Sequence, residues 1–171
     1  MLESYRAHVA ERAALGIPPL PLTAQQTEEL IGLLKNPPKG EEQALVELIT
    51  YRVPAGVDDA AKVKAEFLAK VAKGTESCVL ISKTKATELL GTMLGGYNVK
   101  PMIDVLGDAE VGAVAAEGLK KTLLVFDFFH DVKELADKGN ANAKAVLQSW
   151  ADGEWFTSRP QVLASQNACI L

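Results

Sequence analysis

The chain has 171 residues, of which 48% are hydrophobic and 23% charged, and its formal net charge is −4. This composition is typical of one soluble globular domain and excludes wholesale disorder, while the acidic balance argues against nucleic acid as the main partner. No apolar run is long enough to cross a membrane, and the first residues lack the apolar core of a secretory signal. We therefore expect a cytoplasmic protein with no membrane partner.

Apolar residues at three- and four-residue spacing predict helices in the first third of the chain. The first helix is expected at residues 2–15, and the proline-rich segment 17–22 that follows must be extended. Thr23 and Gln26 form a capping-box pattern that opens a second helix. A third helix is expected to start near Glu41 and to stop at the proline after residue 53.

The rest of the chain repeats this pattern of capped helices. Side chains able to cap a helix N-terminus stand before each further apolar stripe, at Asp58, Ser82, Asn98, Asp108 and Asn140. The helix after Ser82 is expected to run through Met93, the helix after Asp108 through Leu123, and a short amphipathic helix is expected at residues 131–138. Because period-two alternation never persists, we predict an all-α fold, an irregular α-solenoid of about eight or nine short helices.

Two histidine pairs are the closest approach to a metal site in the sequence. His8 with Glu11, and Asp127 with His130, are each spaced three residues apart on expected helices. Such pairs supply two ligands each, whereas a helical metal site needs at least three, so surface or capping roles are favoured. A small metal-dependent lyase is the alternative, and it requires all four side chains to converge.

The two cysteines, Cys78 and Cys169, are too few for a disulfide framework or a four-thiolate metal site. No histidine lies near Cys78 in the sequence, so an inert, partly buried thiol is favoured over a nucleophile. We assign no catalytic and no metal-binding residue from the sequence.

A glycine-rich turn, Gly95, Gly96, Tyr97 and Asn98, separates two expected helices. It lacks the Gly-Lys-Ser/Thr end of a phosphate loop and does not follow a strand, so a helix stop is favoured over phosphate binding. Small residues there also let another backbone or a small anion approach closely. The four residues are therefore the first group of candidate interaction residues.

Trp150, Trp155 and Phe156 form the second group of candidate interaction residues. Most aromatic residues are core, but near the end of a helical array they can dock a neighbouring domain. Scattered lysines favour solvated helix faces over an RNA-binding surface. These lysines are Lys83, Lys85, Lys100, Lys120 and Lys121.

Several stretches in order resemble the N-terminal domain of the aconitase B family, the bacterial aconitate hydratase 2. The similar stretches lie at residues 5–14, 33–38, 52–58, 89–98, 122–127 and 148–160. They include Asn36-Pro37-Pro38, Gly95-Gly96-Tyr97-Asn98 and Gln148-Ser149-Trp150-Ala151-Asp152. The resemblance covers about the first 160 residues.

The resemblance implies a HEAT-like helical domain at residues 1–160, placed before catalytic domains that this chain lacks. Residues 161–171 would be a tail or a truncated linker to those domains. In the family, the whole enzyme interconverts citrate and isocitrate with a [4Fe–4S] cluster whose ligands belong to the later domains. No cofactor and no catalytic residue are therefore expected in this chain.

The resemblance also implies what such a domain does. In the family it is associated with self-association, which implies a possible homodimer, with substrate access to the active site, and with a switch towards messenger RNA binding. We predict a non-catalytic interaction domain whose partners are the remaining aconitase domains or another protein. The alternatives are a free-standing helical scaffold, an RNA-binding regulatory relative and the small metal-dependent enzyme.

Overall fold

The computed structural model describes residues 1–122, 125 and 128–153. Within these residues the chain forms nine α-helices and no strand, so the predicted all-α fold is confirmed. The helices are α1 (Leu2–Ala14), α2 (Ala24–Lys35), α3 (Glu42–Tyr51), α4 (Asp59–Ala72), α5 (Lys83–Gly91), α6 (Val99–Asp104), α7 (Gly112–Lys120), α8 (Phe128–Asp137) and α9 (Ala141–Ala151). In the described part of the chain, no helix has the length and apolar character that crossing a bilayer requires.

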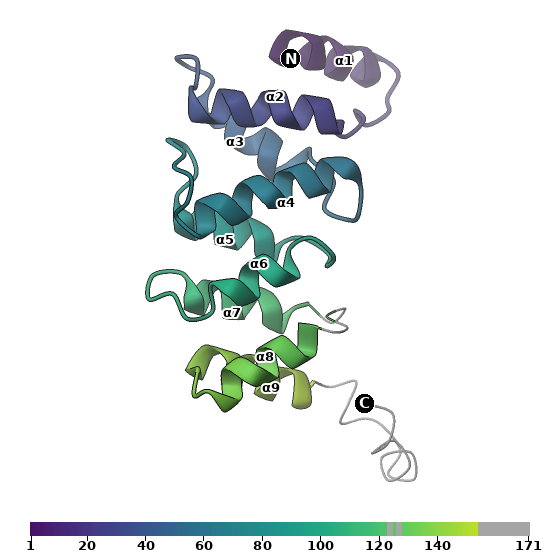
Figure 1. Ribbon diagram of the computed structural model, residues 1–171. Coiled ribbons are helices and arrows are strands. Elements are labelled where there is room, and N and C mark those ends of the chain that lie inside the picture. The colour runs from purple at the N-terminus through teal and green to yellow at the C-terminus, as the bar shows by residue number, and fades with distance from the viewer. Residues whose placement is uncertain (123–124, 126–127, 154–171) are drawn as a thin grey trace, which may run out of the picture.

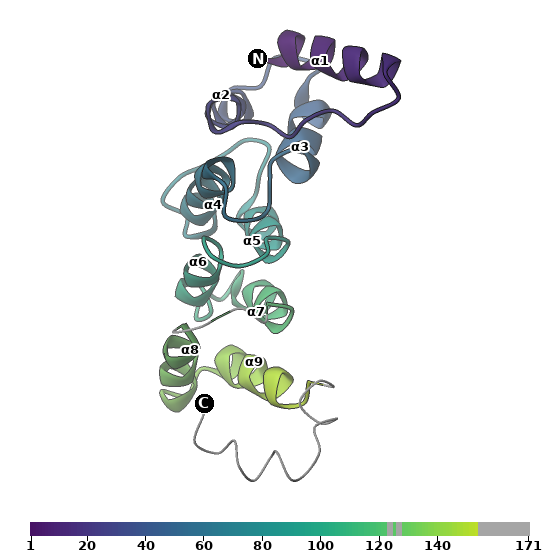
Figure 2. The same cartoon turned by 90° about the vertical axis from the view of Figure 1, so that its right-hand side faces the viewer.

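The helices stack in two columns that run the length of the molecule. Figure 2 shows α2, α4, α6 and α8 in one column and α1, α3, α5, α7 and α9 in the other. Successive helices run in opposite directions, so each loop crosses from one column to the other (Figure 1). The closest contacts join α4 to α5, α5 to α7, and α9 to both α7 and α8. The molecule is thus an elongated stack of helical pairs, and its HEAT-like assignment and the boundary at residue 160 stay predictions.

Three of the predicted helix starts are confirmed by their hydrogen bonds. The Thr23 hydroxyl accepts the Gln26 N–H at 3.2 Å, and the Gln26 side chain accepts the Thr23 N–H at 3.0 Å, which completes the capping box. Ser82 and Asn140 each accept the N–H of the residue three positions on, at 3.1 and 2.8 Å. These caps depend only on neighbours in the sequence, which is why the sequence predicts them.

The other three caps differ from the prediction. Asp58 precedes α4 but its side chain makes no capping hydrogen bond, and the Asn98 side chain donates to carbonyl groups instead of accepting from the helix it precedes. Asp108 accepts the N–H groups two and three residues on, at 2.8 and 3.1 Å, which forms a separate turn. Helix α7 therefore begins only at Gly112.

Two helix boundaries also differ from the predicted ones. Helix α5 ends at Gly91 instead of Met93, because the Leu90 carbonyl accepts the Asn98 side-chain amide at 2.9 Å and so turns the chain early. Helix α8 begins at Phe128, three residues before the predicted start. The predicted end of the preceding helix at residue 123 lies outside the described residues.

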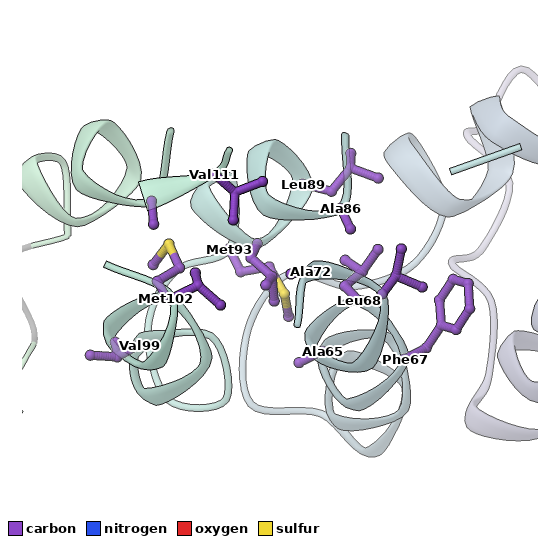
Figure 3. Packing of buried hydrophobic residues seen from close by; sticks show 14 of the residues in the cluster. Ala65, Phe67, Leu68, Ala72, Ala86, Leu89, Met93, Val99, Met102 and Val111 are labelled. Atoms are coloured by element: carbon purple, nitrogen blue, oxygen red, sulfur yellow. The ribbon is translucent and has the colours of Figure 1, made fainter. Parts of the chain in front are cut away.

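The best-filled part of the core lies between α4 and α7. Figure 3 shows Leu68 and Ala72 of α4 facing Ala86 and Leu89 of α5, and each of these side chains is at most 2% exposed. Helices α5 and α7 approach each other through glycine, since a Cβ added to Gly91 would lie 3.0 Å from the Gly118 Cα. The absence of side chains at this crossing lets the two backbones touch.

Candidate functional site

One edge of the stack gathers the turns that follow the odd-numbered helices. Because helix direction alternates, these turns lie on the right in Figure 1, together with the start of α8 and the end of α9. We define the loop edge as residues 15–23, 51–58, 92–98 and 128–130. Proline and glycine are frequent in these turns because they end the helices and set the extended or left-handed backbone that follows.

The loop edge carries nearly all the large apolar side chains that are exposed in the described residues. Seven of the eight belong to it: Leu15, Ile17, Leu20, Tyr51, Val57, Leu94 and Phe129. The eighth, Val79, follows α4 at the opposite edge and is 77% exposed, against 73% for Val57. Single exposed apolar residues are ordinary, but their concentration at one edge distinguishes the loop edge from the rest of the described surface.

Two turns of the loop edge are joined to each other. The Leu94 N–H donates to the Ala55 carbonyl at 2.9 Å, and the Tyr97 hydroxyl donates to the Val57 carbonyl at 3.2 Å. Gly96 has a φ of +89° and lies against Val57, where an added Cβ would come within 3.3 Å of that side chain. Glycine is therefore required here by both backbone and space, and the turns after α3 and α5 form one surface.

The structure separates the four predicted residues of the glycine-rich turn. Gly96 is exposed and Tyr97 partly exposed, whereas Gly95 is buried. Asn98, predicted as a contact residue, lies fully inside: its amide donates to two carbonyls at the end of α5, at 2.9 and 3.2 Å. Its Oδ1 atom is buried without a partner in the described residues. Asn98 thus holds the turn in place, and only Gly96 and Tyr97 are available to a partner.

Trp150 belongs to α9, the last helix of the described stack. Its indole N–H donates to the Leu119 carbonyl at 3.0 Å, and its ring lies 6.3 Å from the ring of Phe129. Trp150 therefore serves mainly to join α9 to α7, with Phe129 exposed beside it. Trp155 and Phe156 lie outside the described residues.

The two histidines that the alternative metal-dependent enzyme would require are not brought together. His8 belongs to α1 and His130 to α8, at opposite ends of the stack (Figures 1 and 2). The Nε2 atom of His8 is already used, since it accepts the Leu20 N–H at 3.0 Å. Among the described residues no three histidine, cysteine or acidic side chains are placed to hold a metal ion, so these residues do not fit an iron–sulfur cluster. Asp127 lies outside the described residues.

Four of the five scattered lysines form ion pairs with carboxylates. Lys83 donates to Asp108 at 3.1 Å and Lys100 to Asp104 at 2.7 Å, and the hydrogen bond to Asp108 raises the pKa of Lys83. Lys85 and Lys120 form similar pairs with acidic neighbours on their own helices. These ion pairs neutralise the lysines locally, so they do not add up to a cationic surface.

Helix α1 is fastened to the stack mainly by hydrogen bonds, which we call the α1 clasp. Arg52 donates from Nε to the Tyr5 hydroxyl at 3.0 Å and from Nη2 to the Pro19 carbonyl at 2.7 Å. The Tyr5 hydroxyl in turn donates to the Leu20 carbonyl at 2.8 Å, and the Leu20 N–H donates to His8. The clasp fixes the extended segment 17–22 between α1 and the end of α3.

A cleft lies between α1 and α3, on the face of the column that they share. Its volume is about 480 Å³, and its lining is mainly apolar, with Leu2, Val9, Pro19 and Leu48 among the contributors. Charged groups from Arg6, Glu47 and Arg52 stand around it. Tyr5 is the only side chain of α1 that is buried, so this helix covers the cleft without filling it.

Lys64 is an ionisable residue that the sequence pattern does not reveal. It lies within the apolar stripe of α4 and is 1% exposed, and burial lowers the pKa of its ammonium group to about 8. It shares a helix face with Phe67, whose ring contacts Lys35 of α2, so Lys64 lies on the side of α4 that meets α2. No ion pair or hydrogen bond of its ammonium group is found among the described residues.

Comparison with known proteins gives consistent matches over almost the whole chain. The family model described as the Aconitate B N-terminal domain matches residues 4–156. Aconitate hydratase B of Pseudomonas aeruginosa is 62% identical over 162 residues, which are 95% of this chain and 19% of the relative. The protein of the same name from Escherichia coli is 60% identical over 160 residues, 94% of this chain and 18% of that protein. The Helicobacter pylori protein is 46% identical over 171 residues, 99% of this chain and 20% of that protein. The chain therefore spans about a fifth of the length of these relatives.

Proposed function

Because the chain belongs to the Aconitate B N-terminal domain family, we propose that it is a non-catalytic domain that packs against the other domains of an aconitate hydratase B through its loop edge. In this arrangement the hydration chemistry belongs to those other domains. This domain holds them in place and restricts the path by which substrate reaches them.

The observation that carries the proposal is the concentration of exposed apolar residues on the loop edge. Seven of the eight large apolar side chains exposed in the described residues lie there. Covering a side chain of this size contributes about 1.5–3 kcal/mol, so a few of them suffice to hold one domain against another.

The direction of the last helix supports the same surface. Helix α9 ends at the loop edge, next to the start of α8 (Figure 1). The relatives are about five times as long as the matched region, so most of their polypeptide lies outside it. Helix α9 thus ends on the same edge that carries Phe129, Leu94 and Val57.

Control of access follows from where the joined turns lie. The turns after α3 and α5 are tied together through Tyr97 and Leu94, so they move as one unit. Gly96 is exposed and Tyr97 partly exposed on the surface of this unit. A neighbouring domain that rests on Gly96 and Tyr97 is held at a fixed distance, which sets the width of any passage between the two.

The docking surface is tested by matched substitutions on the two edges. The binding partner in this test is a P. aeruginosa aconitate hydratase B from which the matching N-terminal domain has been removed. We expect Val57→Asp and Leu94→Asp each to weaken binding of this chain to that partner by about tenfold or more, because each variant places a charge in an apolar contact. Val79→Asp is the control, since Val79 is equally exposed at the opposite edge. Titration calorimetry measures the affinities, and equal losses for all three variants would refute the loop edge.

The non-catalytic role is tested separately. The chain alone is expected not to hydrate cis-aconitate, with or without added iron and sulfide. Turnover that follows the protein through purification contradicts this part of the proposal and leaves the docking result unaffected.

Homodimer formation and RNA binding stay predictions from the resemblance. Sedimentation at increasing concentration checks the first, and titration with RNA at low and moderate salt checks the second. Phosphate contacts would produce a steep salt dependence. The paired lysines described above supply no surface for it. The separation of His8 and His130 leaves the metal-dependent enzyme without support.

A further inference from the structure

We propose that the cleft between α1 and α3 binds a small amphipathic anion, a molecule with an apolar body and one carboxylate group. This site lies on the face of the stack and is separate from the docking function of the loop edge. The size, the lining and the charges of the cleft support this assignment.

The size and lining of the cleft are those of a small-molecule site. A volume of about 480 Å³ falls inside the range of roughly 300–1,000 Å³ that such sites occupy. Apolar side chains from both helices, including Leu2, Val9 and Leu48, line it. Few polar groups stand among them, which is the arrangement that fixes the orientation of a mainly apolar ligand.

Residues of the clasp form part of the wall of the cleft. Pro19 belongs to the cleft wall, and its carbonyl accepts from Arg52 while the next residue is bonded to Tyr5 and His8. The segment that carries Pro19 is therefore held firmly between the two helices.

The charges select an anion. Arg52 is held rigidly because Nε and Nη2 already donate to Tyr5 and Pro19, and no bond of its Nη1 is found among the described residues. A fixed guanidinium with spare N–H groups is suited to a carboxylate, because no side-chain entropy is lost on binding. Arg6 also stands at the rim, but both of its Nη atoms donate to Glu41, whose pKa this hydrogen bonding lowers, so Arg52 is the cation that a ligand would meet. The single acid in the lining, Glu47, accepts a hydrogen bond from Gln43.

The first experiment compares three ligands with the same tail and different head groups. The 171-residue chain, labelled with ¹⁵N, is titrated with octanoate, 1-octanol and octylammonium, and amide shifts are followed by NMR. We expect saturable shifts confined to α1, α3 and the clasp, with a dissociation constant of about 1 mM for octanoate. Octanol is expected to bind several-fold more weakly and octylammonium more weakly still. Equal binding of the three ligands, or shifts scattered over the molecule, would overturn the proposal.

Two substitutions locate the site. Ala44→Phe fills the cleft from α3 and is expected to weaken octanoate binding about tenfold. Ala7→Phe is the matched control, because Ala7 is exposed on α1 and does not line the cleft. If both variants bind octanoate like the original chain, the cleft is not the site.

A third substitution tests the role of the guanidinium. Arg52→Met is expected to remove the preference for octanoate over octanol while octanol binding persists, since the apolar lining is unchanged. Because Arg52 also supports the clasp, α1 could loosen in this variant. Circular dichroism of Arg52→Met shows whether the helix is lost. The Ala44→Phe result shows whether the cleft is the binding site when Arg52 is intact. A preference for octanoate that survives in folded Arg52→Met would refute the anion selectivity.

Discussion

The middle of the stack and its N-terminal end are built differently. From α4 to α7, small and apolar side chains fill the space between helices, and Gly91 and Gly118 let two backbones touch. At the N-terminal end, α1 buries only Tyr5, spans an open cleft and is fastened by the hydrogen bonds of the clasp. One region depends on close filling of space, and the other depends on directed polar contacts.

Helices α4 to α7 are therefore expected to provide the global stability of the fold, whereas α1 is expected to detach without unfolding the rest. Burial of many apolar side chains couples α4 to α7 into one cooperative unit, so damage there should unfold the whole chain. A few hydrogen bonds contribute about 1 kcal/mol each, so damage to the clasp should release α1 locally. A ligand site in the loosely filled region therefore costs the fold little.

The largest expected effect comes from Lys64, the buried charged residue of the middle of the stack in the described part of the chain. Its pKa of about 8 lies below the 10.5 of an exposed lysine, so between these values the unfolded chain binds a proton that the folded chain has released. Unfolding free energy therefore rises with pH from about 8 to about 10.5, by about 3 kcal/mol in total, and is lowest below pH 8. Lys64→Met is expected to gain a similar amount at pH 7 and to abolish this rise.

Urea denaturation at several pH values measures this change. Lys62→Met is the control, because Lys62 is exposed on the same helix. If Lys64→Met and the original chain differ in unfolding free energy by the same amount at pH 7 and at pH 10.5, the ammonium group is not buried in its charged form.

The glycine crossing of α5 and α7 should be the next most sensitive feature. Gly118→Ala places a Cβ 2.8 Å from the Met102 sulfur and 3.0 Å from the Gly91 Cα, and we expect a loss of about 2 kcal/mol in global stability. Gly32→Ala in α2 is the matched control, since nothing lies within 4 Å of an added Cβ. Gly32→Ala should stabilise the fold by about 0.5–1 kcal/mol, because alanine has a better helix propensity than glycine. Thermal unfolding distinguishes the two, and two changes of the same sign would contradict the tight crossing.

The clasp should respond with a smaller and more local effect. Tyr5→Phe removes the hydroxyl that connects Arg52 to the Leu20 carbonyl, at a cost of about 1 kcal/mol. We expect faster amide hydrogen exchange in α1, with α4 to α7 nearly unchanged. Equal acceleration throughout the molecule would mean that α1 belongs to the same cooperative unit as the middle.

The smallest effect is expected at the ion pair between Arg6 and Glu41. The hydrogen bond to Arg6 lowers the pKa of Glu41, so any stabilisation is present at neutral pH and is lost as the pH falls through that lowered pKa. Because the pair is solvated, Arg6→Ala should leave thermal unfolding at neutral pH unchanged. A clear loss of thermal stability would show that α1 is anchored by charge as well as by the clasp.

The sequence predicts what depends on close neighbours along the chain. The Thr23–Gln26 capping box and the Ser82 and Asn140 caps involve residues three positions apart, so their patterns are visible without a fold. The early end of α5 is not visible, because it results from Asn98 reaching back to Leu90 across a turn.

The candidate sites follow the same rule. Gly96 is exposed and Tyr97 partly exposed on the loop edge, whereas Asn98 lies inside, because its side chain bonds to carbonyl groups of the preceding turn. The cleft is missed because α1 and α3 are separated by a whole helix in the sequence. Burial of Lys64 contradicts the usual preference of lysine, and its place within the apolar stripe of α4 is the only signal that could have revealed it.

The two-column arrangement has a consequence for how the chain folds. Among the described residues, the main contacts of each helix are with helices one or two positions away in the sequence, so these contacts form without closing long loops. Chains with such low contact order fold within microseconds to milliseconds. Folding is therefore expected to nucleate at the α4–α5 pair and to spread in both directions, with α1 the last helix to join.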